Sequence, residues 1–309
     1  MNPRTQKAAA LAIAASLVAG GIAWDILHRQ SARSGPVATE VPSLKSISVP
    51  QSDPQATGLR SEIKEILNSS TPARKRIELL RDTAIDLSEP EINALLGEVS
   101  AVPNSDADQA AHVEYLHEIC HLLRKIPAAR ERLSRVLAGI AADSGRQMIV
   151  RDYAIQHLRQ LWALAKEEPE LRQGIRKSFE ELVHADAAVT GPALLSLHVL
   201  GGSAKSKGGE ISDAQIQPLV AEILAKKPDT PGIPAAIAAV RITGDRHLTD
   251  LSPRLREIAA DSSIHALVRM AAVSVISADE PSSLAFLATI DRNDPRVDEA
   301  VRIALRKAP

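Results

Sequence analysis

The stretch Ile140-Ala141-Ala142-Asp143 returns later in the chain as Ile258-Ala259-Ala260-Asp261. A Val-Arg pair follows each copy after the same interval, as Val150-Arg151 in the first and as Val268-Arg269 in the second. A local sequence that recurs with its spacing intact indicates a repeated structural unit. The structure of this unit and the number of its copies therefore determine the fold.

Five pairs of helices can be placed after Pro127 around this junction. In the first helix of each pair, apolar residues recur three and four positions apart, which is the period of an amphipathic helix. Each first helix ends near an aspartate: Asp143, Asp186, Asp229, Asp261 and Asp291. These aspartates are 43, 43, 32 and 30 residues apart, which is typical of two-helix repeats. The second helices are expected at 150–165, 192–200, 234–242, 266–276 and 295–306.

The composition favours the same architecture. Of the 309 residues, 45% are hydrophobic but only 2% are aromatic, so the core must consist of Ala, Leu, Ile and Val. Small side chains on the second helices allow neighbouring helix axes to approach closely, whereas a β-sandwich usually requires aromatic and β-branched strand faces. The sequence therefore predicts an all-α fold, and its length permits more than one domain.

The charge is balanced along most of the chain, with a net charge of -1 at pH 7. Residues 1–59 have 5 basic and 3 acidic residues, residues 60–126 have 8 and 12, and residues 127–309 have 24 and 23. No segment has the basic excess of a nucleic-acid-binding surface, so no nucleic-acid partner is expected. Cys120 is the single cysteine, which excludes an intrachain disulfide.

Residues 1–28 are predicted to be either a cleaved signal peptide or a retained N-terminal membrane anchor. Arg4 and Lys7 precede an apolar run over 8–24, and Gly21-Ile22-Ala23 offers small residues at the spacing of a cleavage site. The run is at the short end of the roughly 17–25 residues of a spanning helix. An anchor would give a single-pass membrane protein with a cytoplasmic N-terminus and an extracytoplasmic body, and cleavage would give a secreted or periplasmic protein of the bacterial envelope.

Residues 29–58 are predicted to be a disordered linker, because they are rich in Ser, Pro, Gly and Ala and show no hydrophobic period. Residues 59–126 follow as an N-terminal helical region. Within it, Ser88 and Pro90 indicate the cap and the first turn of one helix. Another helix is expected over 110–126.

The sequence His117-Glu118-Ile119-Cys120-His121 lies in the last helix of this region and matches the zinc motif H-E-x-x-H. In that motif two histidines one helical turn apart bind zinc, and the glutamate acts as general base on a bound water. A zinc metallohydrolase with His117 and His121 as metal ligands and Glu118 as catalytic base is therefore the enzymatic alternative.

The motif lacks an obvious third ligand. Zinc metalloproteases supply one as a closely following histidine with a glycine or as a glutamate on a second helix, and neither His nor Gly follows His121 closely. Glu131 is too near to belong to a separate helix, and the more distant candidates are Glu167, Glu168 and Glu170. On a helical wheel both histidines lie on the charged face opposite Leu116 and Ile119, which indicates solvated side chains.

The repeated units resemble those of HEAT/armadillo-type α-solenoids. The resemblance rests on Asp143, Val150-Arg151 and Ala154, and on Asp261, Val268-Arg269 and Ala272. It covers residues 127–309 and implies a right-handed superhelical α-solenoid of helix pairs. It also implies that the aspartate caps the second helix or pairs with the repeat's arginine, so that Arg151 and Arg269 have structural roles.

Second helices line the concave face in the family that the chain resembles, which suggests Tyr153, His157, His198 and Arg241 for the binding surface. The leading hypothesis is a non-enzymatic scaffold that binds a protein or peptide without a cofactor and is tethered to a membrane or exported across it. The alternatives are the membrane-tethered zinc hydrolase and a purely structural envelope component. Tightly held zinc that is lost on His117→Ala would favour the hydrolase.

Overall fold

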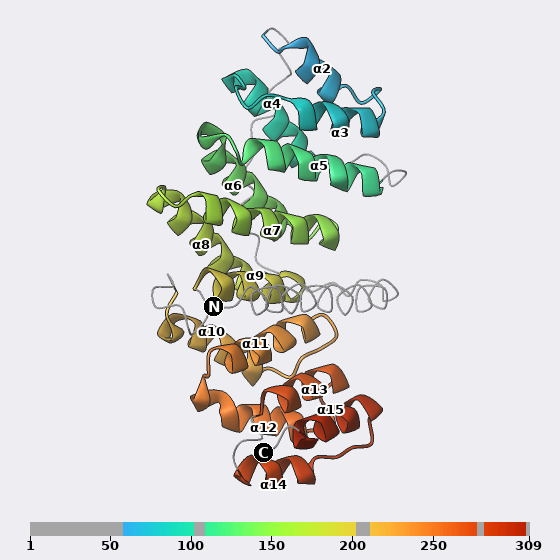
Figure 1. The fold of residues 1–309 in the computed structure, drawn as a ribbon, viewed down its shortest axis with the longest axis vertical. Coiled ribbons are helices and arrows are strands. Elements are labelled where there is room, and N and C mark those ends of the chain that lie inside the picture. Colours follow the sequence, from blue (N-terminus) through green and yellow to red (C-terminus); the bar gives the residue numbers. More distant parts are fainter. Residues whose placement is uncertain (1–57, 102–108, 202–210, 277–280, 307–309) are drawn as a thin grey trace, which may run out of the picture. The chain divides into compact units, whose positions relative to one another are not determined.

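The structure is a computed structural model and describes residues 58–101, 109–201, 211–276 and 281–306. These residues form fourteen α-helices and one 3₁₀ turn without a strand, which confirms the predicted all-α fold (Figure 1). The hydrophobic segment 1–28 and residues 29–57 of the predicted linker lie outside the described ranges. None of the helices in the described ranges combines the length and the apolar character that a membrane span requires.

The predicted N-terminal helical region contains four helices: α2 (Ser61–Leu67), α3 (Ala73–Asp82), α4 (Glu89–Ser100) and α5 (Gln109–Leu123). The start of α4 agrees with the prediction. Ser88 is its N-cap, and the Glu91 carboxylate accepts the backbone N–H of Ser88 at 2.8 Å, which completes a capping box. The end of α5 lies three residues before the predicted one, because Ile126 is the extended N-cap of the next helix.

Ten helices follow in the five predicted pairs. They are α6 (Pro127–Ala142) with α7 (Met148–Leu164), α8 (Pro169–Val183) with α9 (Ala187–Leu200), α10 (Asp213–Ala225) with α11 (Ile233–Asp245), α12 (Ser252–Ala260) with α13 (Ala266–Val275), and α14 (Pro281–Thr289) with α15 (Pro295–Arg306). The 3₁₀ turn η2 (Thr249–Leu251) directly precedes α12.

The predicted start of α9 at Pro192 was wrong by five residues. The helix begins at Ala187, and Pro192 lies inside it. Proline favours the first turn of a helix, and for this reason the start of the helix was predicted at Pro192. The side chain of Asp186 instead caps the helix by accepting the backbone N–H of Ala188 at 2.9 Å, so the cap rather than the proline sets the boundary.

The helices pack in chain order, and the second helices of the pairs form a continuous row. The two members of every pair contact one another, from α2 with α3 to α14 with α15. Each second helix also packs against the next second helix, through α3, α5, α7, α9, α11, α13 and α15 (Figure 1). Among the first helices, α2 contacts α4, α4 contacts α6, and α6 contacts α8.

The core between the helices is aliphatic, as the composition predicts. Leucine, isoleucine, valine and alanine make up nearly all the buried apolar side chains, and the fully buried aromatic ones are Tyr115 and Phe179. The second helices that follow α7 contribute many alanines, including Ala193, Ala236 and Ala272, each nearly or fully buried. Short side chains at these positions allow the successive second helices to lie close together.

The five predicted aspartates form hydrogen bonds in the turn that follows the first helix of each pair. The side chains of Asp143 and Asp261 accept the backbone N–H two residues later, at 2.9 and 2.8 Å. Asp186 and Asp291 do the same at 2.9 and 3.1 Å, whereas Asp229 accepts the N–H three residues later at 3.0 Å. Such bonds satisfy donors at the helix ends and fix the turns.

The two arginines of the repeated junction have equivalent contacts. Nε of Arg151 donates to the carbonyl oxygen of Ala141 at 2.9 Å, and Nε of Arg269 donates to that of Ala259 at 3.1 Å, both ten residues earlier. A second nitrogen of each reaches the next pair, where Arg151 bonds the Asp186 carboxylate and Arg269 bonds the Asp291 carbonyl oxygen at 2.9 Å. Both arginines therefore join successive helix pairs from buried positions.

The same arginine contact occurs once more, near the start of the described residues. Nε of Arg76 in α3 donates to the carbonyl oxygen of Ile66 in α2, again ten residues earlier. The turn between them uses Asn68, whose side chain accepts the backbone N–H of Ser70 at 3.0 Å. The pair α2 and α3 thus shares this arginine contact with the pairs α6/α7 and α12/α13.

Candidate functional site

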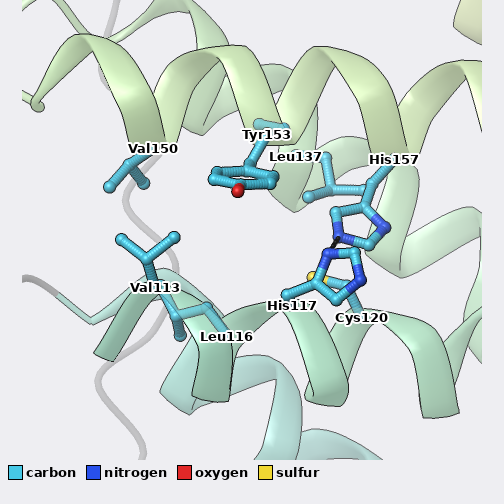
Figure 2. Close-up of a pocket in the computed structure, with 9 residues that line it drawn as sticks. Val113, Leu116, His117, Cys120, Leu137, Val150, Tyr153 and His157 are labelled. Atoms are coloured by element: carbon cyan, nitrogen blue, oxygen red, sulfur yellow. Dashed lines mark hydrogen bonds between the residues drawn. The ribbon is translucent and has the colours of Figure 1, made fainter. Parts of the chain in front are cut away.

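The row of second helices is least closely packed between α5 and α7. These two helices make the least extensive contact of all the successive second helices. A hollow with an almost wholly apolar lining lies between them, which we call the α5/α7 cleft (Figure 2). It is lined by Val113, Leu116, His117 and Cys120 from α5, Leu137 from α6, and Val150, Tyr153, Ala154 and His157 from α7.

The cleft consists of two adjoining hollows that share Val113, His117 and Tyr153, and we call the smaller one the floor and the larger one the mouth. The space at the floor measures about 20 Å³, which is enough for one water molecule but not for a small-molecule substrate. The mouth measures about 180 Å³ and is lined by Val113, Glu114, His117 and Tyr153.

Two histidines meet at one end of the cleft. Nε2 of His157 and Nδ1 of His117 are 3.1 Å apart, and the ring centroids are 4.8 Å apart (Figure 2). Burial, together with the neighbouring His117 and Arg124, lowers the pKa of His157 to about 3. At neutral pH His157 is therefore uncharged, and one of the two facing nitrogens must carry the shared proton.

Tyr153 completes this end of the cleft. Its ring meets that of His117 edge-on, with the centroids 5.9 Å apart and the planes at 66°. In Figure 2 the Tyr153 ring lies between Val150 and His157 on α7, opposite the α5 residues. The tyrosine and the two histidines thus form a cluster of rings at this end of the hollow, which we call the wall of rings.

The H-E-x-x-H residues do not converge on a shared metal position. Glu118 accepts Nε and Nη2 of Arg81 at 2.9 and 2.7 Å, so its carboxylate is engaged with α3. His117 bonds His157, whereas Nδ1 of His121 lies within hydrogen-bond distance of the guanidinium of Arg124. In the parts of the chain that the structure describes, no three His, Cys, Asp or Glu side chains are placed to hold a metal ion.

The proposed third ligands also lie elsewhere. Of the three candidates, Glu168 pairs with Arg130, and Glu131, which the sequence had already excluded, pairs with Arg135 at 3.5 Å. The remaining two candidates, Glu167 and Glu170, are exposed. Cys120 lines the cleft, but burial raises the pKa of its thiol to about 12. The thiol is therefore protonated at neutral pH and is not a reactive nucleophile.

The four residues suggested for the binding surface fall into two places. Tyr153 and His157 lie in the α5/α7 cleft, but His157 is only 3% exposed and forms part of the wall. His198 on α9 and Arg241 on α11 both approach the carboxylate of Asp245, at 3.3 and 3.4 Å. Burial and the neighbouring Arg246 lower the pKa of His198.

Sequence reasoning missed the pairing of His117 with His157 and the contribution of Val113, Glu114 and Val150. A signal for it exists in the sequence. On α5 Val113 precedes His117 by four positions, and on α7 Tyr153 precedes His157 by the same interval. Residues four apart share a helix face, so each helix presents a ring with an apolar neighbour.

Comparison with known proteins does not extend this description. The sequence matches no family model, and neither the curated proteins nor the solved structures contain a match.

Proposed function

We propose that residues 61–306 form a right-handed HEAT-like α-solenoid that binds a protein or peptide along its row of second helices. The observation that supports this most strongly is the unbroken series of contacts from α3 to α15, in which each second helix packs against the next. Helix pairs that contact only their neighbours leave a long face of adjacent helices available to an extended partner.

The proposed array begins earlier than the sequence suggests. Arg76 repeats the contact that Arg151 and Arg269 make with a carbonyl oxygen ten residues before them. The pairs formed by α2 with α3 and by α4 with α5 would then be the first two repeats, in place of a separate helical region over 59–126. The α5/α7 cleft would lie at the junction between the second and third repeats.

The chemistry of the cleft supports binding over catalysis. Its lining is mostly apolar, its floor holds no more than a water, and the Glu118 carboxylate accepts two hydrogen bonds from Arg81 of α3. A general base must reach the proton that it abstracts, and Glu118 is directed toward α3 instead. No observation favours the zinc hydrolase, so the scaffold is the function we propose.

The membrane arrangement is part of the same proposal. The basic flank at Arg4 and Lys7 and the apolar run over 8–24 support a segment that directs residues 61–306 across a membrane and either remains as an anchor or is cleaved. Mass spectrometry of the N-terminus of the protein isolated from its source distinguishes the two. An intact Met1 or Asn2 supports the anchor, and a start near Trp24 supports cleavage.

Site-specific photo-crosslinking tests the binding face. A benzophenone amino acid is placed at Tyr153, Leu195 or Ile237, which are partly exposed on α7, α9 and α11. The controls carry it at Arg135 on α6 or Lys177 on α8, whose side chains are 69% and 75% exposed. We expect the same partner to be captured in cells from at least two second-helix positions and from neither control. Capture from the first helices alone would contradict the proposal.

Metal analysis tests the absence of a catalytic zinc site. We expect purified full-length protein to hold far less than one zinc per chain, with no change on His117→Ala. One tightly held zinc per chain that is lost in His117→Ala would contradict the proposal and favour the hydrolase.

A further inference from the structure

We infer that the α5/α7 cleft receives an aliphatic side chain that is flanked by lysine or arginine in an extended segment of a protein partner. The inference rests on the proposed binding function and names the chemistry of the partner at one position of the row. It follows from three features of the cleft, which are its shape, its charge and its hydrogen-bonding groups.

The shape selects an aliphatic side chain. Val113 and Val150 face one another across the hollow in Figure 2, with Leu116 on the α5 side. Apolar groups that leave water on entering such a lining stabilise the complex in proportion to the area they bury. The space of about 20 Å³ at the floor accepts the tip of a branched aliphatic group but is too small for an aromatic ring.

The charge at the mouth selects a cation. Arg81 binds Glu118 through two nitrogens and Glu114 through one hydrogen bond of 3.1 Å, so this cluster of one cation and two carboxylates has a net charge of -1. Glu114 is 54% exposed at the side chain and lines the mouth directly. A basic partner is therefore complementary in charge, and an acidic one is repelled.

The wall of rings can orient the main chain of the partner. The hydroxyl of Tyr153 both donates and accepts hydrogen bonds, and His117 has a second ring nitrogen beside the one that faces His157. Both residues line the mouth, where an extended segment would pass across α5 and α7. Its backbone N–H and C=O groups require such partners when they leave water.

Three capped decapeptides of equal length test the inference on the full-length protein in a non-ionic detergent. The first alternates Lys with Leu, the second alternates Glu with Leu, and the third alternates Lys with Ala. Binding is followed from the methyl resonances of Val113 and Val150, with Val199 as an internal control because it is 54% exposed on α9. A titration of peptide into detergent alone corrects for binding to micelles.

We expect the Lys-Leu peptide to shift the methyl resonances of Val113 and Val150 without shifting those of Val199. It should also bind at least tenfold more tightly than the Glu-Leu peptide or the Lys-Ala peptide. Glu114→Lys should reverse the preference between the Lys-Leu and Glu-Leu peptides. Glu299→Lys, which changes an exposed glutamate on α15 in the same way, should leave the preference unchanged.

Equal binding of the three peptides, or shifts that spread to Val199, would overturn the inference. So would a Glu114→Lys variant with the preference of the wild type. If these tests fail while photo-crosslinks still form from Leu195 and Ile237, the scaffold function stands and only the assignment of the cleft falls. If neither experiment succeeds, both proposals fail.

Discussion

Helix α7 is joined to its two neighbours in different ways. Toward α9 it is held by buried Arg151, which bonds the Asp186 carboxylate of the next pair. Toward α5 it is held by the hydrogen bond between His157 and His117, beside an open cleft. The same helix thus takes part in one closed junction and one open junction, so side chains rather than backbone topology decide where a hollow forms along the row.

The junctions between α9 and α11 and between α11 and α13 are also closed. A methyl group added at Gly191 of α9 would lie 3.0 Å from the carbonyl carbon of Pro234 and 3.1 Å from the backbone nitrogen of Ala235, both in α11. A methyl group at Gly244 of α11 would lie 2.9 Å from Val275 of α13. The close approach of these helices requires glycine, whereas valine and tyrosine side chains line the hollow between α5 and α7.

The largest effect is expected from removing the arginine of the closed junction. Arg151→Ala leaves the Ala141 carbonyl and the Asp186 carboxylate without their donor, so we expect the free energy of unfolding to fall by about 3 kcal/mol. Urea denaturation followed by circular dichroism measures the change. Arg176→Ala removes an i,i+4 pair with Glu180 on α8 and should cost less than about 0.5 kcal/mol. Equal losses in the two variants would show that the buried contact does not hold α7 to α9.

The histidine contact of the open junction should make stability depend on pH. Burial lowers the pKa of His157 to about 3 from an ordinary value near 6.5, so the unfolded chain binds a proton that the folded chain excludes. The stabilisation is complete above pH 6.5 and is lost as the pH falls toward 3. Between pH 7.5 and pH 5 the loss amounts to about 2 kcal/mol.

Urea denaturation across this pH range tests the histidine contact. His157→Leu should remove about 2 kcal/mol of the loss, whereas His184→Leu, which replaces an exposed histidine, should retain it. An unchanged pH dependence in His157→Leu would contradict the buried, uncharged state of this side chain.

Two glycine substitutions are expected to have opposite signs. Gly191→Ala gains about 1 kcal/mol of helix propensity but forces a methyl group against the backbone of α11, which typically costs 1–3 kcal/mol, so we expect a net destabilisation of about 1 kcal/mol. The methyl group added by Gly174→Ala on α8 meets no atom within 4 Å, so this substitution should stabilise the protein by about 1 kcal/mol. Thermal denaturation of both variants distinguishes them, and stabilisation of Gly191→Ala would mean that α9 and α11 are not in close contact.

The smallest effect is expected from enlarging a side chain of the cleft. Val113→Leu adds a methylene that the hollow can accept, so the free energy of unfolding should change by less than about 0.5 kcal/mol. Val240→Leu adds the same group to a fully buried position on α11, where overpacking typically costs about 1–3 kcal/mol. Urea denaturation measures both changes. If Val113→Leu lowered the free energy of unfolding as much as Val240→Leu, this would show that the junction between α5 and α7 is closed.

The helices could be predicted because their periodicity is local. Apolar spacing and turn residues placed all five pairs after Pro127, and the aspartates were found in the turns where they were expected. The start of α9 was wrong because two local signals competed, a proline and an aspartate cap, and the cap prevailed. Arg76 was missed as a repeat residue because its turn uses Asn68 and its preceding helix has no alanine pair.

The candidate site was less predictable because it depends on contacts between helices. The H-E-x-x-H spacing places His117 and His121 one helical turn apart, which is a local relation. The partner of His117 is His157, 40 residues later on another helix, and no spacing rule within one helix reports that contact. The partner of Glu118 is Arg81, 37 residues earlier, which explains why a carboxylate assigned to zinc chemistry is held in an ion pair.

The position of Cys120 provides a natural sensor of the seam between α5 and α7. It is the single cysteine of the chain, its thiol lines the cleft and is 3% exposed, and burial raises its pKa to about 12. A thiol reagent can react with it only when the two helices part, so the labelling rate reports the opening frequency of that seam without any engineered dye or tag. A ligand that clamps the helices together would slow the rate, and acid that breaks the imidazole contact would increase the fraction of time that the seam is open.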